Sequence, residues 1–457
     1  AARAAAAEGG GGGGEVSEGY TPAFKSVRLL TFAGILFGYA SYYLTRNSLT
    51  YTAPVMVATA GLGVDVRSIG LMTSIFPIAY GFSKFVSGVL GSLMSASKLL
   101  GLGLIATSAI NIAFGYQASM WWFCVLWAAN GLLQGIGGPC CARILTTWFA
   151  SKERGTYWGM WNIAHNLGGF AAPLIAGSAA SKFGWQWGMW VPGAIGLVLG
   201  SVLLLGLRES PEAAGFPPVE ADPEPPKAAA DEGGEAGKPN VWRMLLDTVL
   251  KNPYIWGMAV TYFFIYIIRQ GVTSWFVFYM IQEKGAVDAA AAAARVSGLE
   301  LGGLVGSLLA GRLSDWMVNR AKPGEGAVGK RVQVVMGYTV GVAAMLLAFW
   351  SCPAGAGALQ WATVFMIGFF LYGPQMLIGL CGAELVGPAA VGASEGFLGY
   401  VAYLGAANAG APLAHVVREM GWTAYFVTLL TACGLALALL VPMRNLPSHV
   451  QQVTGEM

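Results

Sequence analysis

Charged residues are scarce in this chain. Only 11% of its 457 residues are Asp, Glu, Lys or Arg, whereas soluble globular proteins carry about 25%. Hydrophobic residues make up 56%, and the mean hydropathy is +0.59. This composition excludes an ordinary soluble domain and predicts an integral membrane protein in a lipid bilayer. The formal net charge of +3 gives no reason to expect a nucleic-acid partner.

Histidine and cysteine are also few. The chain has three histidines and six cysteines, from which no zinc motif and no catalytic triad can be assembled. We therefore predict no metal, no cofactor and no enzymatic activity. Most cysteines fall within apolar segments, so we expect small packing residues at Cys124, Cys140, Cys141, Cys352, Cys381 and Cys433.

Long apolar runs, in contrast, are abundant. Twelve are long enough to span a bilayer, six on each side of a polar stretch at 209–250. They fall at 28–58, 66–90, 98–117, 121–146, 156–181, 187–207, 252–281, 296–317, 332–351, 358–383, 390–417 and 421–443.

This pattern predicts an all-α protein made of two six-helix halves. The predicted units are a disordered tail (1–24), the first half (25–208), a linker (209–250), the second half (251–445) and a C-terminal tail (446–457). The linker contains a Pro-, Ala- and acid-rich segment without apolar periodicity, so we expect a flexible tether.

The loops differ in their basic residues. One set of loops carries Lys25, Arg28, Lys98, Lys152, Arg154, Arg208, Lys227, Lys238, Arg243, Arg312, Arg320, Lys322, Lys330, Arg331 and Arg444. The opposite set carries only Arg67, Lys182, Lys284, Arg295 and Arg418. The excess predicts that both termini and the linker face the cytoplasm, or its equivalent in an organelle.

Two arginines lie near the middle of apolar segments, Arg46 in the first half and Arg269 in the second. A centrally placed arginine costs roughly 2.5–3.5 kcal/mol on insertion scales, so it is expected to face a cavity or a partner. Tyrosines repeat seven and three residues before each: Tyr39 and Tyr43, Tyr262 and Tyr266. A duplicated helix with a charge at its centre is typical of a transporter site between two halves. Two guanidinium forks favour an anion such as a phosphate.

The first residues, AARAAAAEGGGGGG, are low in complexity. They resemble the remnant of an organellar transit peptide, and a plain disordered tail is the alternative. With the resemblance described next, they favour the inner envelope membrane of a plastid (chloroplast) over a bacterial cytoplasmic membrane.

Several motifs resemble the organophosphate:phosphate antiporter family of the major facilitator superfamily. They are GYASYYLTRNSL (38–49), AYGFSKFVSGVL (79–90), GLLQGIGGPCCARILTTWF (131–149), SKERGTYWGMWNIAHNLGG (151–169), FFLYGPQMLIG (369–379) and GFLGYVAYLG (396–405). SGLELGGLVGSLLAGRLSD (297–315) and AYLGAANAGAPLAHVV (402–417) most resemble the hexose-phosphate sensor-type branch. The resemblance implies the major facilitator fold, with twelve transmembrane helices in two pseudo-symmetric halves.

The resemblance also implies a set of site residues. The substrate arginines fall on Arg46 and Arg269, the cavity lysine on Lys84, and the cavity histidine on His165 with Asn162 and Asn166 beside it. The cavity tyrosines fall on Tyr39, Tyr43, Tyr266, Tyr372 and Tyr403. Other roles remain open from the residues alone: Lys84 can extend to an interface, His165 can join two helices as a neutral ring, and each tyrosine can serve packing only.

Five further positions match or depart from the family pattern. Glu300 matches a position of interhelical pairing, and Asp315 lies in the recurrent G-x-L-S-D loop, so we expect both to act in gating. Ser92 replaces the corresponding aspartate of the first half. Glu395 keeps an intramembrane carboxylate, but Leu398 stands where some carriers have a lysine, so we expect Glu395 to be unpaired and to bind substrate hydroxyls; an interfacial glutamate is the alternative.

A further departure is Ser274, which occupies an aspartate position of the glycerol-phosphate branch. Its loss makes the empty cavity more positive. The predicted function is exchange of a sugar phosphate, glucose 6-phosphate above all, for inorganic phosphate by a single chain. The alternatives are a hexose-phosphate receptor that does not transport, and a proton- or sodium-coupled symporter that uses Glu395 or Glu300.

Overall fold

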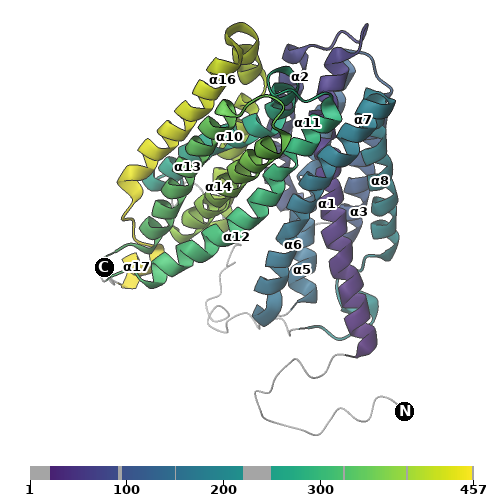
Figure 1. The fold of residues 1–457 in the computed structure, drawn as a ribbon. Coiled ribbons are helices and arrows are strands. Elements are labelled where there is room, and N and C mark those ends of the chain that lie inside the picture. The colour runs from purple at the N-terminus through teal and green to yellow at the C-terminus, as the bar shows by residue number, and fades with distance from the viewer. Residues whose placement is uncertain are drawn as a thin grey trace.

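The computed structural model describes residues 21–90, 95–149, 151–219, 249–322, 325–386 and 390–454. Within these ranges every regular element is a helix, and the helices form two bundles (Figure 1). Eight helical stretches are long and apolar enough to cross a membrane by their composition alone. The predicted limits of the tails and the linker stay predictions, since 1–20 and 220–248 lie outside the described residues.

The first bundle contains helices that begin at Pro22 and end at Gly206. They are α1 (Pro22–Ala58), α2 (Val66–Leu90), α3 (Ala96–Gly115), α4 (Met120–Gln134), α5 (Gly137–Trp148), α6 (Ser151–Ala172), the π-helix η1 (Pro173–Gly177), α7 (Ser178–Phe183) and α8 (Trp185–Gly206). A one-turn 3-10 helix, η2 (Glu212–Ala214), follows.

The second bundle begins at Pro253. It contains α10 (Pro253–Gln282), α11 (Ala289–Val296), α12 (Gly298–Asn319), α13 (Ala327–Ser351), α14 (Gly357–Glu384), α15 (Val391–Asn408) and α16 (Ala411–Leu440), followed by η6 (Val441–Met443) and α17 (His449–Thr454). The described helices thus make up twelve membrane segments in two groups of six, which confirms the predicted fold class.

Three of these segments are interrupted. The fourth, predicted as one apolar run at 121–146, consists of two helices, because α4 ends at Gln134 and α5 starts at Gly137. Here α2 passes so close that a Cβ on Gly135 would lie 2.4 Å from the Ser83 hydroxyl. The eighth segment starts earlier than predicted, as α11, and breaks at Ser297. The eleventh is α15 continued by the first ten residues of α16, up to Gly421.

The two halves repeat one turn. Gly184, with φ of 101°, ends the fifth segment, and Gly421, with φ of 77°, ends the eleventh. A positive φ is readily adopted only by glycine. Each glycine is followed by a tryptophan, Trp185 or Trp422, that starts the next membrane helix. This shared turn supports the internal duplication.

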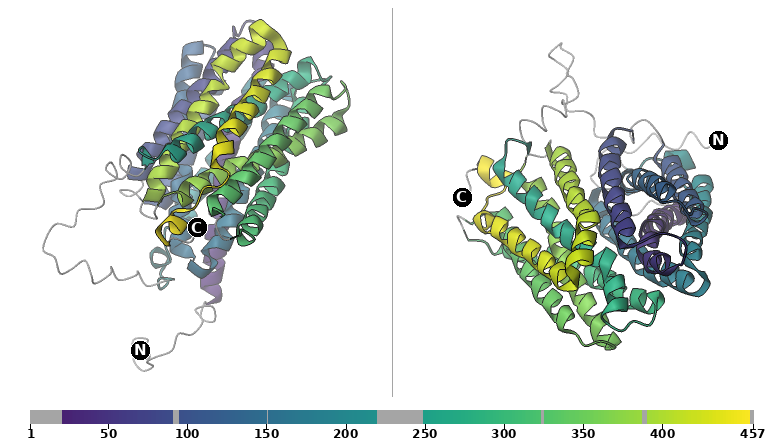
Figure 2. Two further views of the ribbon diagram at one scale, coloured as in Figure 1. Left: turned by 90° about the vertical axis from the view of Figure 1, so that its left-hand side faces the viewer. Right: turned by 90° about the horizontal axis from the view of Figure 1, so that it is seen from above.

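The halves meet at the end of the molecule opposite the two termini, and diverge towards the termini (Figures 1 and 2). A Cβ on Gly70 of α2 would lie 2.4 Å from the Ala414 side chain of α16. Close by, Ser74 donates to the Ala407 carbonyl at 2.5 Å and accepts from the Ala411 N–H at 2.8 Å. We call this the outer end. The structure is therefore closed at the outer end and inward-facing with respect to the termini.

Candidate functional site

Arg46 lies in the middle of α1 with its guanidinium between two tyrosine rings. Its Cζ is 4.4 Å from the centroid of the Tyr43 ring and 4.3 Å from that of Tyr80. Nε and Nη2 are buried and have no hydrogen-bond partner. None of the ion pairs among the described residues involves Arg46. The two nearby rings stabilise the cation, and the two nitrogens without a partner are available for an acceptor.

Arg269 occupies the matching place in α10. Its Cζ lies 5.7 Å from the Tyr266 centroid and 5.4 Å from that of Tyr372. Its Nε is likewise buried without a partner, and in the described structure it forms no ion pair within 4.0 Å. Among the described residues, neither arginine therefore forms a structural ion pair with a carboxylate, which is the alternative to an anion-binding role.

Both arginines line a single cavity between the halves. Its volume is about 50 Å³, and its wall includes Tyr43, Tyr403 and Glu300. A cavity with two arginines and several hydroxyl and amide groups in its wall suits a small anion with several acceptor oxygens.

Tyr403 and Lys84 extend this site across the interface of the halves. The Tyr403 ring of α15 lies 4.6 Å from Tyr80 of α2 and 5.4 Å from Tyr266 of α10. The Lys84 ammonium lies 5.6 Å from both the Tyr80 and the Tyr403 centroids. Lys84 is exposed although it stands within a membrane segment, so it faces the inward-open space.

His165 of α6 joins the two halves at the same level. Its ring is parallel to Tyr372, with 6.2 Å between centroids, and lies 5.8 Å from Tyr43. With the Asn166 amide oriented to satisfy both of its atoms, it accepts from His165 Nε2 at 3.2 Å and donates to the Glu300 carboxylate at 3.2 Å. Glu300 is therefore an interhelical contact between α12 and α6, while Asn162 is exposed.

The remaining predicted tyrosines differ in their surroundings. Tyr39 packs on Trp161 at 4.8 Å and on Tyr43 at 5.5 Å, within the core of the first half. Tyr262 packs on Tyr266 at 4.8 Å and donates its hydroxyl to the Gln375 carbonyl at 2.7 Å. Tyr39 is thus mainly a packing residue in this state.

Glu395 lies on the terminus side of the arginines. The carboxylate stands next to Gly379 of α14 and is exposed. The Glu395 carboxylate interacts electrostatically with the Lys84 ammonium of α2, in the other half. Lys84 thus supplies a positive charge near Glu395, which the buried Leu398 of its own helix does not.

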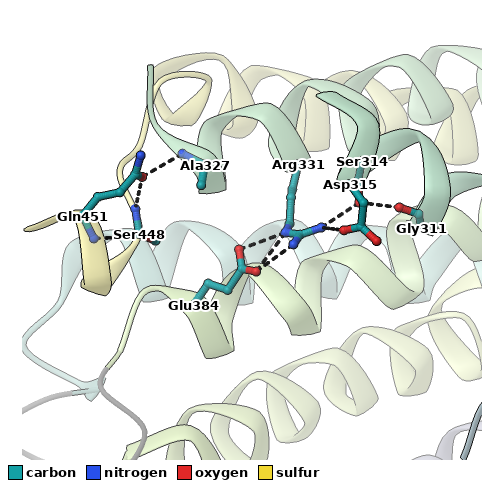
Figure 3. Close-up of polar contacts among 8 residues, drawn as sticks. All are labelled: Gly311, Ser314, Asp315, Ala327, Arg331, Glu384, Ser448 and Gln451. Atoms are coloured by element: carbon teal, nitrogen blue, oxygen red, sulfur yellow. Dashed lines mark hydrogen bonds and ion pairs between the residues drawn. The ribbon is translucent and has the colours of Figure 1, made fainter. Parts of the chain in front are cut away.

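Among the described residues, the ion pair of Asp315 lies within the second half. Asp315 forms an ion pair with Arg331 of α13 at 2.8 Å. The same guanidinium also contacts the Glu384 carboxylate of α14 at 2.9 Å and donates to the Ser314 hydroxyl at 2.8 Å (Figure 3). The cluster ties α12, α13 and α14 together on the terminus side of the second half. Ser92, the predicted counterpart in the first half, lies outside the described residues.

Sequence reasoning missed several residues of the site. Tyr80 stands four residues before Lys84, which is the spacing of neighbours on one helix face, and this signal was available. Gln375 has a buried Oε1 without a partner and lies three residues after Tyr372. Ser274 was singled out only for a missing carboxylate; it lines the cavity and accepts from Gln270 at 2.7 Å.

A model of the Major Facilitator Superfamily matches residues 35–410. The chain belongs to the Major Facilitator Superfamily. It is thus a member of a transporter family and not an enzyme, as predicted. Solved structures agree on the fold of this facilitator protein. A bacterial homologue of the human lysosomal transporter Spinster, inward-facing and unoccupied, has a TM-score of 0.70 at 17% identity and covers 93% of this chain and 96% of its own.

Sequence relatives define the branch of the superfamily. The membrane sensor protein UhpC of Salmonella typhimurium is 40% identical over 90% of each chain. A probable hexose phosphate transport protein of Chlamydia pneumoniae is 38% identical over 92% of each. A glycerol-3-phosphate transporter of Bacillus subtilis is 31% identical over 94% of this facilitator and 95% of its own length. These similarities confirm the organophosphate:phosphate antiporter family.

Proposed function

We propose that the protein is a secondary antiporter that exchanges a sugar phosphate for inorganic phosphate by alternating access. The observation that supports this proposal is that Arg46 and Arg269, one from each half, line one cavity with buried N–H groups that have no partner. Unpaired buried donors are costly unless a ligand satisfies them. A phosphate dianion supplies both the charge and the acceptors.

Exchange rather than leak follows from the same charges. The empty site holds two arginines that resist being enclosed together, and a bound dianion neutralises them. The ligand therefore favours the occluded arrangement through its differential affinity for it. The inward-facing structure supports a rocking motion, because the halves join at the outer end around Gly70 and Ala414.

Acceptors for hydroxyl groups support a sugar as the organic part. Tyr262 lies seven residues before Arg269, about 10 Å towards the termini. Next to it are the unpartnered Oε1 of Gln375 and, on α15, the Glu395 carboxylate, whose charge reaches Tyr262. A hexose whose phosphate lies between the arginines extends in this direction. Glucose 6-phosphate is our first candidate, and the hexose phosphate carriers among the relatives support it.

Counterflow tests the proposal. Liposomes containing the purified protein and preloaded with phosphate should take up labelled phosphate, and glucose 6-phosphate outside should compete. Empty liposomes should take up none. Uptake without internal phosphate would contradict exchange, and no competition would contradict the sugar phosphate.

A receptor is the second candidate, because the sensor UhpC is 40% identical to this chain. A receptor binds hexose phosphate tightly but shows no counterflow in the same liposomes. The third possibility raised by the sequence, a proton- or sodium-coupled symporter, predicts exchange that depends on pH or sodium. Exchange that depends on neither pH nor sodium would rule out the symporter.

The remaining parts of the proposal concern assembly and location. We propose that one chain is the working unit, because the described site is completed by the two halves of a single chain. We keep the plastid inner envelope as the proposed membrane, on the composition of residues 1–20; the relatives compared above are bacterial. Fusion of the N-terminal segment to a fluorescent protein, with plastid import as the readout, tests it.

A further inference from the structure

The repeat around the arginines continues beyond them. An amide follows each arginine directly, and a threonine follows four residues later: Asn47 and Thr50 after Arg46, Gln270 and Thr273 after Arg269. All four line the cavity that holds the arginines. Because α1 and α10 both run from the terminus side to the outer end, the two threonines lie one turn, about 6 Å, further outward.

Most of these amide and hydroxyl side chains have donors or acceptors without a partner. The side chains of Asn47 and Thr50 make no hydrogen bond with any described residue, and neither does the side chain of Thr73 of α2, which lines the same cavity. Gln270 donates to Ser274 at 2.7 Å and retains a second N–H. Thr273 bonds its own helix at the Arg269 carbonyl, at 2.9 Å. Together with the partnerless arginine nitrogens, these donors fit a ligand rich in acceptors.

The charges in the cavity wall favour an anion. Its charged residues are Arg46, Arg269 and Glu300, which leaves a net positive charge. Glu300 is turned to its neighbours, since the Asn166 amide contacts its carboxylate and a Cβ on Gly169 would lie 2.6 Å from its Cδ. The carboxylate is therefore engaged by α6.

We propose that this part of the cavity is a second position for inorganic phosphate, on the outer side of the arginines. The inference rests on the proposed function. In this state the position is closed to the outside by the contact of Gly70 with Ala414, and the arginines separate it from the inward-open space. Phosphate moves to it from the arginines as the outer end opens, and the duplicated amides and threonines replace part of its hydration.

Removal of the two hydroxyls tests the position. In Thr50→Val/Thr273→Val, the turnover rate of phosphate:phosphate exchange in proteoliposomes should fall roughly tenfold or more, since hydrogen bonds to a charged ligand are the strong ones. The KM for phosphate on the terminus side should stay within about threefold, because the arginines still hold the first position. Thr50→Ser/Thr273→Ser keeps both hydroxyls and should restore exchange.

A matched control separates this effect from helix packing. Thr261 and Thr428, like Thr273, donate to the carbonyl four residues back, at 2.8 Å each, and line no part of the cavity. Thr261→Val/Thr428→Val should exchange at the wild-type rate. Unchanged turnover in the Thr50/Thr273 variant, a loss equal to that of the control, or a rise in KM without loss of turnover would each overturn the second position. Absence of exchange in the wild type would instead refute the proposed function.

Discussion

Replacing Arg46 by lysine keeps the charge but removes the planar fork. The guanidinium is held between Tyr43 and Tyr80 at 4.4 and 4.3 Å, with Nε and Nη2 free of partners. A lysine offers a phosphate one bond in place of two, a loss of about 1.5–3 kcal/mol for a bond to a charged group. Poorer packing between the two rings adds about 0.5–2 kcal/mol.

Together these terms predict a fall in kcat/KM for phosphate exchange of roughly 30-fold to several thousandfold. Because the buried charge is retained, the melting temperature should change by only a few degrees. The assay is counterflow of labelled phosphate in proteoliposomes, with thermal unfolding in detergent beside it. Arg269→Lys should behave in the same way.

Arg295→Lys is the matched control. Arg295 bonds the Gln360 side chain at 2.7 Å and the Lys284 carbonyl at 3.2 Å, away from the cavity. Its variant should lose stability but keep exchange. If Arg46→Lys retains a third or more of wild-type exchange, the two-fork arrangement is wrong.

Three further outcomes are expected. Gln375→Leu should raise the KM for glucose 6-phosphate about tenfold, through loss of one hydroxyl contact, and leave phosphate homoexchange within about twofold; equal effects on both would contradict its role. Arg331→Met should lower the unfolding free energy by about 2–3 kcal/mol, because Glu384 loses a bidentate partner, and unchanged thermal unfolding would refute this. Hydrogen bonds from Ser68 lower the pKa of Asp65 at the outer end, so its stabilisation is complete above about pH 4 and is lost as the pH falls through that lowered pKa; Asp65→Asn should abolish the acid-induced part of hydrogen exchange near residue 65.

The membrane segments and the central arginines were predictable because their signals are local. An apolar run of spanning length predicts a membrane helix in any context. A lone arginine within it indicates a functional site, because inserting its charge into the membrane costs free energy. The boundary between the predicted runs 390–417 and 421–443 lies close to the observed turn at Gly421 for the same reason. The break between α4 and α5 was not, because it depends on how closely α2 approaches Gly135.

Contacts between the halves were the part that sequence could not provide. His165, Asn166 and Glu300 were each selected by resemblance, but their chain of contacts joins helices that are more than a hundred residues apart. Gln375 is an ordinary residue of an apolar segment until Tyr262 of α10 is placed next to it. The charge near Glu395 likewise comes from Lys84 of the other half, not from its own helix.

Efflux of labelled glucose 6-phosphate tests the central claim most directly. Proteoliposomes are loaded with the labelled sugar phosphate and diluted into buffer with or without inorganic phosphate. The account predicts that label leaves only when external phosphate is present, and that Arg46→Lys and Arg269→Lys each slow this efflux by roughly 30-fold or more. Efflux into phosphate-free buffer, or no efflux at all alongside tight binding of the sugar phosphate, would contradict an exchanger built on the two arginines.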